Sequence, residues 1–183
     1  MTGFYDVGAL GEIAVNLFHG WGYNFYREEN QLRADDQLIR SMASGLLAQA
    51  RAALEAAEAA YRRERLPPPS RAQPFSDPAA VAGAQGLERL GRAIGSLEGQ
   101  VRHQPVPEND RMTQRYRREA STLEALTEWD KRLVGQAELL RTTLTGAGGD
   151  ALLAQAPELE KGIAAITETL RQRQDVLLGG GDG

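Results

Sequence analysis

The stretch that decides the fold runs from Asn24 to Arg65 and reads NFYREENQLRADDQLIRSMASGLLAQARAALEAAEAAYRRER. It contains no proline, and its one glycine, Gly45, costs a helix only about 1 kcal/mol. Its apolar residues recur at the spacing of one helical face: Phe25, Leu32, Ile39, Met42, Leu46, Ala50, Leu54, Ala57 and Tyr61. We therefore predict one long helix over residues 24–65. At 1.5 Å per residue it would be roughly 60 Å long and would need partners along its whole length.

The rest of the chain contains segments that suit this role. Amphipathic patterns over residues 78–103, 109–145 and 157–178 predict three further helices, and a shorter pattern predicts an N-terminal helix over residues 6–18. Asp77-Pro78 is typical of a helix start, because aspartate caps the first turn and proline suits the first helical position. The sequence therefore predicts an all-α fold, an elongated antiparallel bundle of four main helices with a short N-terminal helix.

We expect residues 1–178 to form a single all-helical domain. Five of the eight prolines fall between Pro67 and Pro78, which predicts an extended linker over residues 67–77. Residues 179–183 read GGGDG and are expected to be a disordered tail. Because the first and third helices are predicted to be longer than the others, part of the long apolar stripe should stay uncovered. Either the longer helices protrude as an antiparallel coiled coil, or a second copy of the chain covers the overhang, and we expect a homodimer or a tight hetero-complex.

Three glycines recur every four residues in the second predicted helix, at Gly91, Gly95 and Gly99. Such a strip of small residues lets another helix approach closely, so we predict tight helix–helix packing there. The alternative is a ligand that lies against the strip.

The composition excludes several classes of function. The formal net charge of −4 argues against a nucleic-acid-binding protein, which usually has a basic face. The chain has no run of 18 apolar residues, so we expect no membrane insertion. Its first residues lack the basic and apolar pattern of a signal peptide, so we expect a cytoplasmic protein. The absence of cysteine excludes thiolate metal sites and cysteine nucleophiles.

No catalytic motif is recognisable. The His-Glu-x-x-His pattern, the phosphate-binding loop and the serine elbow are all missing. A di-iron bundle would need Glu-x-x-His, but Asn16 and Gln100 precede His19 and His103 by three residues. His19, close to Trp21, is a weak candidate for cofactor binding, and capping of a helix end is the more common role of such a histidine. We therefore expect no cofactor.

Paired acids could bind a metal. Glu28-Glu29 and Asp35-Asp36 lie seven residues apart and so share one helical face. Arginines interleave with them, which favours a solvated face laced with salt bridges. The alternative is a carboxylate metal site, which would need Glu119 or Asp130 to arrive from the third predicted long helix.

Four of the eleven aromatic residues lie within six positions, at Trp21, Tyr23, Phe25 and Tyr26. Tryptophan, tyrosine and arginine most often anchor protein interfaces, so we predict that Trp21, Tyr23, Tyr26 and Arg27 bind a protein partner. The alternative is that the rings are buried as a cap on the bundle. The favoured function is thus a non-enzymatic interaction subunit, such as an adaptor, an assembly factor or a small accessory subunit. A metal- or cofactor-binding four-helix bundle with redox or hydrolytic activity is the alternative.

Overall fold

The structure is a computed structural model that describes residues 3–21, 32–71, 74–104 and 119–178, without the side chains of 32–35, 119–124 and 177–178. Within these residues the chain is all-helical, as predicted. The helices are α1 (Val7–Trp21), α2 (Leu32–Arg65), α3 (Pro78–Arg102), α5 (Glu119–Leu144), α6 (Gly149–Ala154) and α7 (Ala156–Leu178). Predicted residues 24–31 and 109–118 of the long helices lie outside the described residues.

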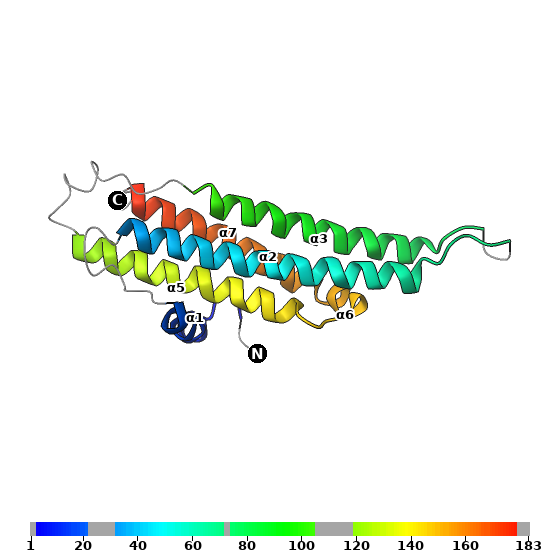
Figure 1. Ribbon diagram of the computed structural model, residues 1–183, viewed down its shortest axis with the longest axis horizontal. Coiled ribbons are helices and arrows are strands. Elements are labelled where there is room, and N and C mark those ends of the chain that lie inside the picture. The colour runs from blue at the N-terminus through cyan, green and yellow to red at the C-terminus, as the bar shows by residue number, and fades with distance from the viewer. Residues whose placement is uncertain (1–2, 22–31, 72–73, 105–118, 179–183) are drawn as a thin grey trace.

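Four long helices form an elongated bundle in which successive helices run in opposite directions (Figure 1). Each of α2 and α7 packs against both α3 and α5, so the four helices surround one core. The short α6 covers the end of the bundle near the α2–α3 connection, and α1 lies against the outside of α5 (Figure 1). None of the described helices is long and apolar enough to cross a lipid bilayer.

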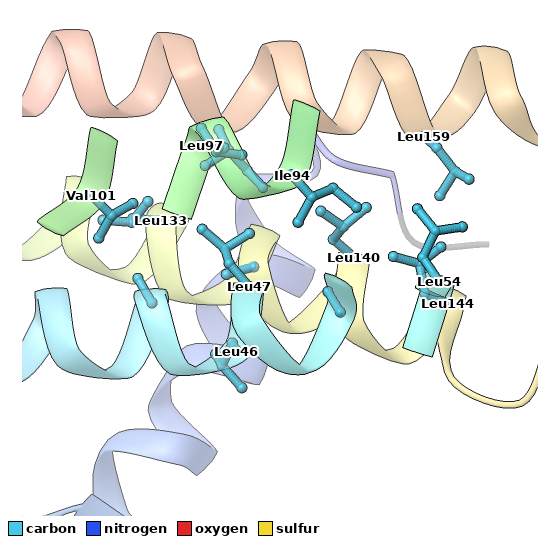
Figure 2. Packing of buried hydrophobic residues seen from close by; sticks show 14 of the residues in the cluster. Leu46, Leu47, Leu54, Ile94, Leu97, Val101, Leu133, Leu140, Leu144 and Leu159 are labelled. Atoms are coloured by element: carbon cyan, nitrogen blue, oxygen red, sulfur yellow. The ribbon is translucent and has the colours of Figure 1, made fainter. Parts of the chain in front are cut away.

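The apolar stripe of α2 is the centre of the core. Ile39, Met42, Ala50 and Leu54 are at most 1% exposed. They meet leucine-rich faces of the other helices, as Figure 2 shows for Ile94, Leu97, Val101, Leu133, Leu140, Leu144 and Leu159. Each fully buried leucine or isoleucine stabilises the fold by about 1.5–3 kcal/mol relative to an exposed one. Burial of these shared stripes therefore holds the bundle together.

Local signals set the helix ends. The Oδ1 atom of Asp77 accepts a hydrogen bond from the backbone N–H of Ala79 at 3.1 Å, and Pro78 occupies the first turn of α3, as predicted. After α5 the chain turns at Gly146, whose φ of 76° lies in the left-handed region that favours glycine. At the other end of the chain, α1 continues through Gly20 to Trp21, three residues beyond the predicted end. One glycine in a helix is too weak a signal to end it.

The prediction of an uncovered stripe on the long helix is wrong for the described part. From Ile39 to Tyr61 each residue of that stripe is at most 8% exposed. The end of the stripe near the α2–α3 connection is covered by α6. The first residue of α6, Gly149, packs against the ring of Tyr61 near the end of α2. The short α6, which the sequence analysis does not count among the main helices, thus closes the core, and the uncovered stripe no longer argues for a dimer.

The predicted close packing along the glycine strip is also wrong. A Cβ atom built on Gly99 would meet no atom within 4 Å, and one on Gly95 would meet only the flexible side chain of Arg51 at 3.4 Å. The closest backbone approach is at Gly135 of α5 instead. A Cβ there would lie 3.0 Å from the Cα atom of Leu10, so α1 requires glycine at this position.

Candidate functional site

Among the helices of the described residues, α1 is the long one that packs on the outside of the four-helix bundle, and its inner face is firmly anchored. Leu10, Ala14 and Phe18 are at most 1% exposed and lie at helical spacing. Because Gly135 has no side chain, the backbone of Leu10 rests directly on α5. A buried stripe and a close backbone contact therefore fix α1 on the bundle.

The segment before α1 adds a second anchor. The side-chain amide Nε2 of Gln136 in α5 donates a hydrogen bond to the carbonyl oxygen of Phe4 at 3.0 Å. The Phe4 ring covers Gly162 of α7, where a Cβ atom would lie 2.6 Å from the ring carbon Cζ. The N-terminal part of the chain thus spans α5 and α7, and α1 has a defined orientation.

Large apolar side chains are exposed at both ends of α1 and just before it. Four large hydrophobic residues are classed as exposed in the described chain, and three belong to α1 or to its approach: Tyr5 at 69%, Val7 at 43% and Trp21 at 49%. Phe18 follows Ala14 by four residues and Trp21 follows Phe18 by three, so Trp21 continues the buried stripe. Half of the Trp21 side chain is nevertheless open to solvent. Exposed apolar residues that gather on one element are typical of a binding surface.

A groove of about 640 Å³ runs between α1 and α5. Its residues come mostly from one face of α1, and they are Val7, Gly8, Gly11, Glu12, Val15, Asn16, Glu128 and Lys131. The Nζ atom of Lys131 lies 2.7 Å from Oε1 of Glu128, so these two charges are paired on the α5 side. Glu12 forms no ion pair with any described residue, which leaves the α1 side of the groove acidic.

The predicted site residues are only partly described. Trp21 is half exposed, and its role in binding stays a prediction, whereas Tyr23, Tyr26 and Arg27 lie outside the described residues. His19 is exposed in the last turn of α1, and its ring is hydrogen-bonded to no described residue. The described residues contain no cluster of three or more histidine or acidic side chains that could hold a metal ion.

The interpretation of the paired acids as a solvated face is wrong for Asp36. Its side chain is 1% exposed and lies in the core beside the equally buried Arg173, whose Nη2 atom is 2.8 Å from Oδ1 of Asp36. Helical spacing placed the acid on the same seam as Ile39, three residues later, and that seam faces inward. Glu28 and Glu29 lie outside the described residues, as do the side chains of Asp35 and Glu119.

Asp130 reaches the same place from α5. The Nε atom of Arg173 donates to Oδ1 of Asp130 at 2.5 Å, and Asp130 is 0% exposed. The two carboxylates that the metal alternative required are thus brought together, but a guanidinium from α7 lies between them. Arg40 completes the cluster, because its Nη2 atom lies 2.8 Å from Oδ2 of Asp36 and its Nη1 atom donates to the carbonyl oxygen of Gln104 at 3.1 Å.

Two guanidiniums balance two carboxylates in this cluster of Asp36, Arg40, Asp130 and Arg173, which we call the buried charge cluster. It connects α2, α5, α7 and the segment after α3. An arginine is always charged in a protein, so its burial requires the carboxylates as partners. The cluster therefore favours the register of α2, α5 and α7 in which these four side chains meet over any register in which they do not.

Arg173 was missed at the sequence level, although a signal was present. In α7 the seam residues Leu159, Ile163, Ile166 and Leu170 advance by four, three and four residues, and the next step of three arrives at Arg173. A single arginine on an apolar seam, in a chain that also has single aspartates on two other seams, indicates a buried ion pair.

Searches with this chain against models of protein families, against curated proteins and against solved structures find no match.

Proposed function

We propose that the protein is a non-enzymatic helical subunit that binds another protein through α1 and the residues on either side of it. The single observation that supports this most strongly is the concentration of exposed Tyr5, Val7 and Trp21 on this one segment, next to an open groove. Aromatic residues are the most frequent anchors of protein interfaces. The predicted interface residues Tyr23, Tyr26 and Arg27 follow Trp21 within six positions of the sequence.

The anchoring of α1 supports the proposal further. A surface that is already ordered loses less conformational entropy on binding than a flexible one. The close contact of Leu10 with Gly135 and the hydrogen bond from Gln136 to Phe4 hold α1 in place from its inner side. The residues exposed at the two ends of α1 can therefore be presented without refolding. We further propose that the partner is a different protein and that the interaction takes place in the cytoplasm.

The test uses the double variant Val7→Asp with Trp21→Ala in the full chain. Aspartate is tolerated at Val7, the first residue of α1, because an acid suits the positive end of the helix dipole. Wild type and variant are affinity-tagged, and retained proteins from extracts of the native host are compared by quantitative mass spectrometry. Gln85→Ala on the exposed side of α3 serves as the control.

We expect at least one protein that wild type and the Gln85→Ala control retain equally and that the double variant loses. The melting temperature of the double variant should stay within a few degrees of wild type, because exposed substitutions usually change stability by less than about 0.5 kcal/mol. Equal retention by all three proteins would contradict the proposal. So would a large fall in melting temperature, which would make Trp21 part of the core.

A further inference from the structure

The groove between α1 and α5 suits an occupant that pairs its own backbone groups. Its α1 wall consists of Val7 and of five residues at the spacing of one helical face, which are Gly8, Gly11, Glu12, Val15 and Asn16. That face extends over about 12 Å along the helix. The backbone groups of the wall belong to a helix, and the described residues contain no strand whose edge could pair with an extended segment. An α-helix needs no such edge, because its backbone hydrogen bonds are internal.

Two glycines leave space in the groove that this chain does not fill. A Cβ atom built on Gly11 would meet no atom within 4 Å, and one built on Gly8 would meet only Oδ1 of Asp6 at 3.7 Å, an ordinary contact distance. Gly135 in the same interface differs, because the backbone of Leu10 occupies the place of its side chain. The packing of α1 therefore does not require Gly8 or Gly11. Where side chains are this small, a second helix can approach α1 closely.

The groove is acidic when all of its charged residues are counted. Glu128 and Lys131 compensate each other, since Nζ of Lys131 lies 2.7 Å from Oε1 of Glu128. The third charged residue of the lining, Glu12, is exposed and forms no ion pair with any described residue. Asp6, which caps α1, is exposed and free of ion pairs in the described chain as well. Residues 1–21 contain these two acids and no lysine or arginine.

Other charged groups around α1 do not reverse this balance. The guanidinium of Arg132 in α5 lies over the ring of Trp129, 4.5 Å from its centroid, and Arg132 does not line the groove. Lys161, near the start of α7, lies 2.6 Å from a carboxylate oxygen of Glu158 and is compensated by it. His19 in the last turn of α1 does not line the groove either. The groove therefore favours an occupant that carries a positive charge.

The same features argue against other kinds of occupant. Nucleic acids and anionic membrane surfaces are negative, so the uncompensated carboxylates would repel them. Small-molecule sites are usually lined by aromatic and other large apolar side chains, whereas glycine, valine and polar residues line this groove. A positively charged helix of a protein fits both the charge and the shape.

We infer that the groove receives a basic amphipathic helix of the partner protein, whose apolar face packs on Gly8 and Gly11 and whose arginine or lysine lies beside Glu12. The inference rests on the proposed function, and it names the part of the partner that the α1 surface recognises. Each glycine lets the incoming helix lie close to α1, and the pairing with Glu12 fixes its position along the groove.

The first step of the test identifies the bound segment by photo-crosslinking. The full chain carries benzoylphenylalanine in place of Asn16, an exposed residue of the groove, and a control chain carries it in place of Gln100, an exposed residue of α3. Both are irradiated in extracts of the native host, and crosslinked peptides are sequenced by mass spectrometry. We expect an adduct from position 16 only, to a segment with apolar residues at helical spacing and at least one arginine or lysine. No adduct, or an adduct to an acidic or non-periodic segment, overturns the inference.

The second step measures the affinity of the full chain for a synthetic peptide with the sequence of that segment. Gly11→Leu places a side chain in the groove and Glu12→Arg reverses its uncompensated charge, so each should weaken binding at least about tenfold without lowering the melting temperature. The matched controls are Gly99→Leu in α3, where a Cβ atom also meets no atom within 4 Å, and Glu64→Arg in the last turn of α2, which lies away from α1 (Figure 1). Unchanged affinity of Gly11→Leu or Glu12→Arg, or an equal loss in the controls, overturns the inference.

Two changes in the peptide test its charge and its conformation. Replacement of its arginine or lysine by glutamate should weaken binding to wild type and should restore binding to Glu12→Arg by at least about tenfold, as expected of two groups in direct contact. A proline in the middle of the peptide should abolish binding, because proline breaks a helix. Failure of the charge exchange to restore binding, or tolerance of the proline, overturns the inference.

The outcome is distinguishable from a failure of the proposed function. If the double variant Val7→Asp with Trp21→Ala loses no protein from the extract, both the proposed function and the inference fall. If the double variant loses a partner that Gly11→Leu and Glu12→Arg still bind as wild type does, α1 binds a protein by another surface, and only the inference falls.

Discussion

Replacement of Arg173 by methionine tests the role of the buried charge cluster. Methionine keeps much of the length of the side chain and removes only the charge and the hydrogen-bond donors. The guanidinium contacts Asp36 at 2.8 Å and Asp130 at 2.5 Å, and all three side chains are at most 1% exposed. The variant therefore leaves buried carboxylates without the cation that lies between them.

The expected loss of stability is large. Removal of one partner of a buried ion pair typically costs about 3–5 kcal/mol, because the remaining charge keeps its desolvation penalty. Arg40 still pairs with Asp36 and lessens the effect at that carboxylate, so we expect about 3 kcal/mol for Arg173→Met. This is a substantial part of the roughly 5–15 kcal/mol that stabilises an ordinary domain.

Urea unfolding followed by circular dichroism measures the change, with the slope of the transition as a check that unfolding stays two-state. Arg171→Met, two residues away on the same helix, is the matched control. Arg171 pairs with Glu168 and Asp175, but it is 59% exposed, so its removal should change stability little. If Arg173→Met were as mild as Arg171→Met, the cluster would contribute no more than a surface ion pair, and our reasoning would be refuted.

A triple replacement separates the cost of breaking the cluster from the net value of having it. In the chain with Asp36→Leu, Asp130→Leu and Arg173→Met, no buried carboxylate of the cluster remains. Arg40 loses Asp36 as a partner, but it is 15% exposed and keeps its hydrogen bond to the carbonyl oxygen of Gln104. Replacing a buried ion pair with apolar residues of similar volume is often neutral or stabilising by about 1–4 kcal/mol. We therefore expect the triple variant to be clearly more stable than Arg173→Met alone. A triple variant as unstable as the single one would show that packing, rather than charge, is responsible.

Three further predictions follow from individual positions. Gly135→Ala should destabilise the protein by about 1–3 kcal/mol or detach α1, because its Cβ atom would collide with the backbone of Leu10; thermal unfolding and hydrogen exchange of α1 measure this. Gly99→Ala should stabilise it by about 0.5–1 kcal/mol, because the new methyl group meets no atom within 4 Å and alanine favours the helix; an unchanged or lower melting temperature would contradict this. Hydrogen bonds from Arg171 and then Gln172 lower the pKa of Glu168 from its ordinary 4.5 to about 2, so its contribution to stability is present above pH 4.5 and is lost as the pH falls toward 2. In a carboxyl NMR titration, Arg171→Gln should raise the pKa of Glu168 toward its ordinary value.

The seam residues show how far sequence reasoning reached. Apolar periodicity predicted the all-α fold, the four long helices and most of the buried residues, because burial of an amphipathic face depends mainly on local spacing. The same spacing placed Asp36 and Arg173 on inward-facing seams. The prediction for Asp36 nevertheless failed, because its neighbouring charges were given more weight than its position on the helix.

The candidate site was predicted only in part. Trp21 was predicted to bind a partner, which stays a prediction, and its side chain is half exposed. Val7 and Tyr5 were not singled out. Val7 lies three residues before the buried Leu10 and so on the same face of α1, and its exposure depends on how α1 packs against α5, which local spacing does not determine.

By itself the sequence determined the helices, their approximate ends and the inward face of each long helix, because these depend on interactions between residues a few positions apart. Only the tertiary structure decided which glycine admits a neighbouring backbone and which charges meet. Gly99 and Gly135 both lie within helices, but only at Gly135 does another element approach closely enough to exclude a side chain. Asp36, Asp130 and Arg173 lie far apart in the chain and become one cluster only when α2, α5 and α7 pack in a single register.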